Sequence, residues 1–146
     1  MNKNSSNYLG QEICFLAYVE TKNVSIAKGH DKYHVALSFL NGAILEMLYF
    51  TPGTADYNEV EKEFAAGNLY QQSGSCSIPG YHPANGEFYN VASNLRVIMV
   101  IGFQNGESLV CGTVENPVLI TSKFNQAKKA HLIEFNRTGS KALWLE

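Results

Sequence analysis

The sequence is poor in charged residues. Of its 146 residues, 16% are Asp, Glu, Lys or Arg, whereas about 25% is usual in soluble domains. The formal net charge is -2, so there is no strong field to attract nucleic acid or an anionic membrane. Asn, Gly, Ser and Tyr are present in place of charged residues. Removing water from a surface of this kind costs less free energy when it contacts another surface. The composition favours assembly or recognition surfaces, although many β-rich domains share it.

Long apolar runs are also missing. The longest, LRVIMVIGF at residues 95–103, is far shorter than the roughly 20 residues that a membrane-spanning helix needs. Residues 1–10, MNKNSSNYLG, lack the apolar segment of a secretory signal peptide. We therefore expect no membrane partner and a cytoplasmic location, or a place in a virion or secreted assembly. Residues 1–8 are expected to be a flexible polar tail and residues 9–146 a single β-rich domain.

Familiar cofactor motifs are absent. The sequence has no dinucleotide-binding glycine fingerprint, no Walker loop, no nucleophile-elbow serine and no acidic calcium loop. We therefore predict no cofactor. A small basic and aromatic cluster lies at residues 123–131, KFNQAKKAH, but on a chain of negative net charge it does not favour a nucleic-acid partner.

Cysteine is scarce and its count is odd. Cys14 and Cys111 lie in apolar, strand-like runs, and Cys76 lies among serine, proline and glycine. This distribution indicates a reducing compartment and not a disulfide framework. Cys76 and His82 are weak candidates for a nucleophile and its base. A catalytic thiolate needs an activating neighbour, and here no helix begins after the cysteine while Pro83 places His82 in a turn.

Histidine offers one further chemical possibility. His30 and His34 are four residues apart in GHDKYH, a spacing that places two zinc ligands on one face of a helix. On a strand the same spacing spans about 13 Å, too far for one ion, although a turn could still bring the rings together. We predict no metal site.

The strongest local signal is Asn41–Gly42 between two β-prone runs, which predicts a type I′ hairpin over residues 33–50. In that register Glu46 shares the apolar face with Leu48. Either this carboxylate faces a ligand inside a barrel or groove, or a curl or bulge of the sheet returns it to solvent.

Asn105–Gly106 predicts a second hairpin with the same turn, which places Arg96 opposite Glu115. The near-continuous apolar run at residues 95–101 indicates a central strand that is covered on both faces.

A third hairpin is predicted over residues 131–146, closed by a longer loop that contains glycine. It pairs Phe135 with Ser140 and places Glu134 opposite Lys141. Further strands are expected at residues 11–20, 24–27 and 118–122.

One amphipathic helix is predicted near residues 56–66. Asp56 and Glu59 have the spacing of a capping box, Tyr57 and Val60 begin an apolar stripe, and Gly67 suits a helix end.

The fold class is therefore mainly β, or α+β at most. We expect an antiparallel β-barrel or sandwich of about seven or eight strands, built from three hairpins. The order of three strands, a helix and two strands also resembles an OB-fold in topology alone.

Residues 68–90 read as a long loop that is rich in tyrosine and asparagine. Such loops are usually functional or self-packed, and this mixture suits recognition.

The function predicted is a non-enzymatic assembly or binding protein, a self-associating subunit of phage or secretion type, whose partner is itself or another protein. The alternatives are a small-ligand (nucleotide or sugar) binder with a pocket near Glu46, Tyr81 and His82, an OB-like single-strand binder, and a Cys–His hydrolase. The predicted contact residues are Tyr70, Tyr81, His82, Asn85, Phe88, Tyr89 and Glu46.

Overall fold

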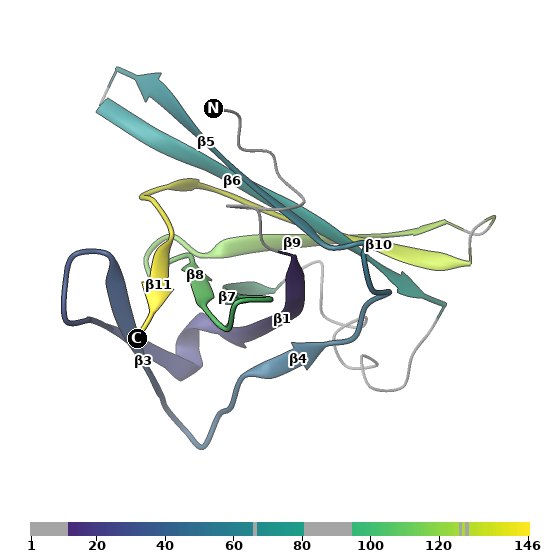
Figure 1. The fold of residues 1–146 in the computed structure, drawn as a ribbon, viewed down its shortest axis with the longest axis horizontal. Helices are drawn as coiled ribbons and strands as arrows, with labels where there is room; N and C mark the ends of the chain where they lie inside the picture. Colours follow the sequence, from purple (N-terminus) through teal and green to yellow (C-terminus); the bar gives the residue numbers. More distant parts are fainter. Residues whose placement is uncertain (1–11, 66, 81–94, 126, 128) are drawn as a thin grey trace.

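The computed structural model of the chain describes residues 12–65, 67–80, 95–125, 127 and 129–146 (Figure 1). Regular structure in these ranges is β-strand, apart from one turn of 3-10 helix, η2 (Thr21–Asn23). The strands are β1 (Ile13–Glu20), β2 (Val24–Lys28), β3 (His34–Phe39), β4 (Glu46–Leu48), β5 (Asp56–Phe64), β6 (Gly67–Pro79), β7 (Arg96–Phe103), β8 (Ser108–Cys111), β9 (Val118–Asn125), β10 (Ala130–Gly139) and β11 (Leu143–Leu145). No helix within the described ranges is long and apolar enough to cross a membrane.

These strands form one open sheet of 11 strands. Its main path runs β2-β3-β11-β8-β7-β9-β10-β6-β5, while β1 pairs with β7 and β4 pairs with β1. The sheet is mixed because β11 runs parallel to β3, whereas the other pairs are antiparallel. The prediction of a mainly β fold is confirmed. The prediction of a barrel is wrong, because β2 and β5 lie at opposite ends of the path and do not pair. The predicted seven or eight antiparallel strands are also wrong, because the described ranges contain 11 strands and one parallel pair.

The sheet folds over on itself and encloses the main core. In Figure 1, β6, β9 and β10 extend across the molecule above β1, β7 and β8. Alternate side chains of the two groups of strands meet between them in one buried cluster. Its largest fully buried members include Leu16, Tyr57, Ile78, Met99, Ile101 and Phe135.

Strand β7 is buried on both faces, as predicted from its apolar run. Val97, Met99 and Ile101 belong to the main core, whereas Ile98 and Val100 belong to a second cluster on the opposite face. Side chains of β1, β2, β3 and β11 cover that second face. A strand with two covered faces has no polar alternation, which explains the continuous apolar sequence.

The predicted helix at residues 56–66 is wrong, because residues 56–64 form β5. This strand pairs along its whole length with β6, from Asp56↔Ser75 to Phe64↔Gly67. The side chain of Asp56 accepts hydrogen bonds from the backbone N and the hydroxyl of Ser75 instead of capping a helix. Without a helix after the third strand, the OB-like order also fails.

The turn at Asn41–Gly42 forms, but the hairpin does not. Both residues have positive φ, 58° and 71°, and Ala43 N donates to Leu40 O over 3.0 Å. Beyond this turn the two runs separate: β3 pairs with β2 and β11, and β4 pairs with β1.

The second hairpin forms with a register one residue away from the prediction. Three residues, 104–106, close it, with Gly106 at φ 92° and Phe103 N bonded to Glu107 O. Ile101 therefore lies opposite Leu109, and Arg96 lies opposite Leu119 of β9 instead of Glu115.

The third hairpin is wrong. Strand β10 pairs with β9 and β6, so Phe135 lies between Ile120 and Gly74. The short strand β11 crosses to β8 and β3. The strands expected at residues 11–20, 24–27 and 118–122 are present as β1, β2 and β9.

Candidate functional site

The predicted contact loop at residues 68–90 is a strand over its first half. Residues 67–79 form β6, which pairs with β5 on one side and β10 on the other. Tyr81, His82, Asn85, Phe88 and Tyr89 lie outside the described residues, so their contact roles stay predictions.

Cys76 is buried in the main core, on the inner face of β6 and opposite Ile133. Burial, together with the nearby negative charge of Asp56, raises the pKa of its thiol to about 12. A thiol with this pKa is almost fully protonated at neutral pH, and it has no access to a substrate. Its position gives no support to the hydrolase alternative.

The two described contact candidates lie on different parts of the sheet. Tyr70 is half-buried on β6, with the ammonium of Lys141 5.1 Å above its ring centre. Glu46 is exposed on β4, opposite Tyr18 of β1. The alternative in which its carboxylate reaches solvent is therefore correct, and the structure does not bring Glu46 and Tyr70 into one site.

A buried polar network crosses the base of the β5–β6 hairpin. The Gln72 amide donates to Glu59 Oε1 and to Ser140 O, each over 3.0 Å. Its oxygen accepts from Arg137 Nη1 over 2.6 Å and from Cys111 Sγ over 3.3 Å. Gln72 therefore uses all of its hydrogen-bonding capacity within the protein interior.

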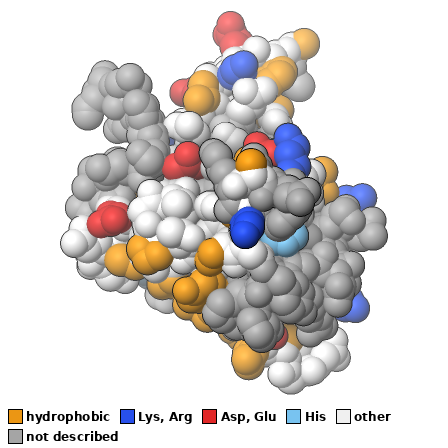
Figure 2. Space-filling model, turned by 90° about the vertical axis from the view of Figure 1, so that its right-hand side faces the viewer, with side chains coloured by type: hydrophobic (Ala, Val, Ile, Leu, Met, Phe, Trp, Pro, Cys, Tyr) orange, Lys and Arg blue, Asp and Glu red, His pale blue; other side chains and the backbone are white. Residues whose placement is uncertain are grey.

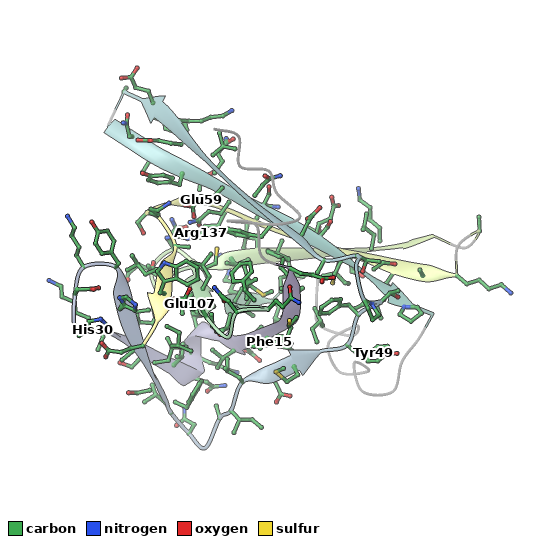
Figure 3. All side chains as sticks on the ribbon, viewed as in Figure 1. Phe15, His30, Tyr49, Glu59, Glu107 and Arg137 are labelled. Carbon is green, nitrogen blue, oxygen red and sulfur yellow. The ribbon has the colours of Figure 1, made fainter. Side chains whose placement is uncertain are left out.

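Glu59 and Arg137 are the charged ends of this network, and Figure 3 labels both where the hairpin leaves the rest of the sheet. The Glu59 side chain, 2% exposed, lies 2.6 Å from the ammonium of Lys141 and accepts from Ala142 N. Arg137 donates to Asn116 O and Ser140 O, each over 2.8 Å. Because these groups are paired with one another, the network braces the hairpin and does not form an open binding site. Sequence reasoning missed it because Glu59 was assigned to a helix cap.

Exposed apolar side chains collect in a different place, the segment that includes β4. We call Phe39, Leu40, Ile44, Met47 and Tyr49 the 39–49 surface. Ile44 is 67% exposed and Met47 57% exposed. Figure 2 shows hydrophobic side chains gathered on the lower part of one face of the molecule, and Figure 3 places Tyr49 just beyond β4.

A groove adjoins the 39–49 surface. It has a volume of about 460 Å³ and lies between the start of β1 and the chain that follows β4, with Phe15, Met47 and Phe50 among its lining residues. The β1–β7 register shifts between Ile13 and Phe15. The groove lies where β1 and the β4 segment stop pairing, so side chains of both segments line it.

The outer face of β9, β10, β6 and β5 carries few charged side chains. Cross-strand rows on this face combine Ser73 with Asn136 and Asn58, and Ser75 with Glu134 and Asp56. One ion pair, Lys123 with Glu134 at 3.4 Å, lies among them. This face is regular and mostly uncharged, but no described cavity or cluster on it provides a specific site.

Comparisons with known proteins give no match: no family model, no curated protein and no solved structure matches the chain.

Proposed function

We propose that the protein is a non-enzymatic subunit that associates with further copies of itself through the 39–49 surface. The observation that carries this proposal is the concentration of exposed apolar side chains. Eleven large hydrophobic residues are exposed in the described part of the chain, and five of them form the 39–49 surface. Single exposed apolar residues are normal, whereas a contiguous group is typical of an interaction surface.

The backbone at this surface supports pairing with another strand. Among the described strands, β4 pairs with β1 alone, so its second edge has no strand neighbour there. Free edges of this kind add strands from other chains, and proteins usually protect them with charge or proline. Between residues 39 and 50 the sequence has one charge, Glu46, and no proline.

A second copy of the chain is the partner that fits best. Soluble oligomers are most often symmetric assemblies of identical subunits, in which one patch contacts the same patch of its neighbour. An apolar patch with one charge is suited to that arrangement, because little charge has to be desolvated. The charged fraction of 16% in the whole chain points the same way.

The test is the native mass in solution, measured by light scattering and sedimentation over a wide concentration range. We expect a defined oligomer for the natural sequence and a shift to monomer for Ile44→Lys and Met47→Lys. Val114→Lys is the matched control, because Val114 is an exposed apolar residue outside the segment, and it should leave the mass unchanged. A monomer at every concentration, or an oligomer that survives both lysine variants, would overturn the proposal.

A further inference from the structure

Four side chains with metal-binding chemistry meet beside the turn between β2 and β3. His30 and Asp31 lie in the turn, His34 begins β3, and Glu146 follows β11. In the described ranges, His30, Asp31 and His34 are the only group of three or more possible ligands whose donor atoms all lie within 4.8 Å of one another. The strand geometry that disfavoured a metal does not apply, because the turn brings the two histidines together.

The local backbone holds the three residues in place. Asp31 Oδ1 accepts from Tyr33 N over 2.9 Å, a bond that forms an Asx turn. Gly29 N donates to His34 O over 2.9 Å and closes the turn. A Cβ at Gly29 would lie 2.8 Å from His34 O and 2.9 Å from Glu146 Oε2. Glycine therefore permits the close approach of the chains on which the cluster depends.

The donor atoms of the three residues all lie within 4.8 Å of one another, which is close to the spacing around one ion. His34 Nδ1 lies 2.7 Å from Asp31 Oδ1, and His30 Nε2 lies 3.4 Å from Asp31 Oδ2. The two imidazole centres are 4.3 Å apart. Ligand atoms bound tetrahedrally at about 2.0–2.1 Å from zinc are separated by about 3.3 Å. Small side-chain rotations would therefore place all three donors around one ion.

Glu146 supplies the outer partner that metal-binding histidines usually have. Its carboxylate contacts His30 Nδ1 and accepts from His30 N, and its own backbone N donates to Val35 O over 2.9 Å. A carboxylate on one imidazole nitrogen fixes the ring and leaves the other nitrogen for the metal. Here the other nitrogen, Nε2, is the one that faces Asp31.

We propose that His30, Asp31 and His34 bind a divalent transition-metal ion, with Glu146 orienting His30. Two imidazoles and one carboxylate suit Zn²⁺ and not the all-oxygen sites of Mg²⁺ or Ca²⁺. A hollow of about 330 Å³ borders Asp31 and His34 and leaves room for water as a fourth ligand. The bound ion would strengthen the link between the β2–β3 turn and the residue that follows β11.

The proposal is tested by calorimetric titration of the untagged protein with zinc chloride. We expect one ion per chain, no binding of Mg²⁺ under the same conditions, and visible absorption bands when Co²⁺ replaces zinc. Glu146→Gln should weaken binding about 10- to 100-fold, the usual effect of an outer-partner change. Asp31→Asn and His34→Ala, which change ligands, should weaken it further.

Two controls separate this site from other possible ligands. His131→Ala changes a histidine of β10, and Cys14→Ser removes an exposed thiol; both should bind zinc as the natural protein does. Far-UV circular dichroism of each metal-free variant checks that the fold is retained. Absence of zinc binding, unchanged binding by both Asp31→Asn and His34→Ala, or loss of binding in either control would overturn the proposal.

Discussion

Arg137 Nη1 donates a 2.6 Å hydrogen bond to Gln72 Oε1, and both side chains are buried. The amide of Gln72 in turn donates to Glu59. Gln72 therefore stands between two buried, opposite charges and gives each of them a partner. This relationship fixes how the β5–β6 hairpin is attached to β10 and to residues 140–142.

Removing the cation should destabilise the fold. Arg137→Met leaves the oxygens of Gln72, Ser140 and Asn116 without this donor, and an unmatched buried group costs about 1–3 kcal/mol. We expect a loss of about 3 kcal/mol in the free energy of unfolding, measured with urea. Arg96→Met, at an exposed strand arginine, should change it by less than about 0.5 kcal/mol. Equal effects of the two variants would contradict the assigned role.

The three thiols should differ sharply in reactivity. Cys14 is exposed, whereas Cys76 and Cys111 are buried and uncharged at neutral pH. A disulfide reagent should therefore modify one thiol quickly in the native protein and all three after unfolding. Cys14→Ser should abolish the fast phase. A fast phase that persists in this variant would show that a buried cysteine is accessible.

The buried thiols also predict lower stability in alkali. Burial raises the pKa of Cys76 and of Cys111 to about 12, from 9.0 for an unperturbed thiol. Because the folded state favours the protonated form, this contribution is complete below pH 9 and is lost as the pH rises from 9 toward 12. Each thiol should reduce the free energy of unfolding by at most about 1.4 kcal/mol per pH unit.

Cys76→Ala tests this dependence, because other titrating groups are common to both proteins. Urea unfolding at several values of pH above 9 should give a shallower decline for the variant than for the natural sequence. Parallel declines would mean that Cys76 does not contribute.

Gly102 and Phe15 form a second test of the packing. They are cross-strand partners on β7 and β1, and the Phe15 ring occupies the place where a side chain at Gly102 would stand. Gly102→Ala should cost about 1–3 kcal/mol by displacing the ring. The cost should fall in a Phe15→Ala background, as a double-mutant cycle would measure. Strictly additive changes would contradict this contact.

The comparison of β5 with its sequence shows why one element was mispredicted. Tyr57, Val60 and Phe64 have helical spacing, and Asp56 and Glu59 resemble a capping box. The inward residues of the strand are in fact Tyr57, which donates to Glu59, and Glu59 itself, which accepts from Gln72 of β6 and from Ala142 N. No local pattern reports partners so distant in sequence, and tertiary pairing overrides local preference.

The turns were easier to predict than the pairings. Positive φ at Asn41 and Gly42 depends on those two residues, so the sequence reveals it. The strand with which β4 pairs depends on where the side chain of Leu48 can be buried, and that place is opposite Leu16 of β1. Opposite charges were also poor guides to register, since exposed ion pairs contribute little energy.

The candidate sites also differed in how well the sequence alone predicted them. Apolar neighbours identified Cys111 as buried, but they were misleading for Cys14, which is exposed, and Cys76 is buried although serine, proline and glycine surround it in the sequence. The cluster of His30, Asp31 and His34 required knowledge that the chain turns before β3, and its fourth member is far away in sequence. The predicted hairpin register divided the 39–49 surface, with Phe39 and Ile44 on the core face and Met47 and Tyr49 on the opposite face. Alternation is the same whether the covering layer belongs to this chain or to another, so it could not identify an exposed apolar surface.

The position of β11 has a consequence for how the molecule reaches this fold. The β2–β3 hairpin joins the rest of the sheet through β11, and the paired residues Trp144 and His34 are 110 positions apart. A ribosome therefore releases the hairpin long before the strand that seats it has been made. Contacts of this range slow folding and leave strand edges exposed meanwhile. Until β11 has been synthesised, the edge of β3 has no partner on that side, and it can pair with a wrong strand.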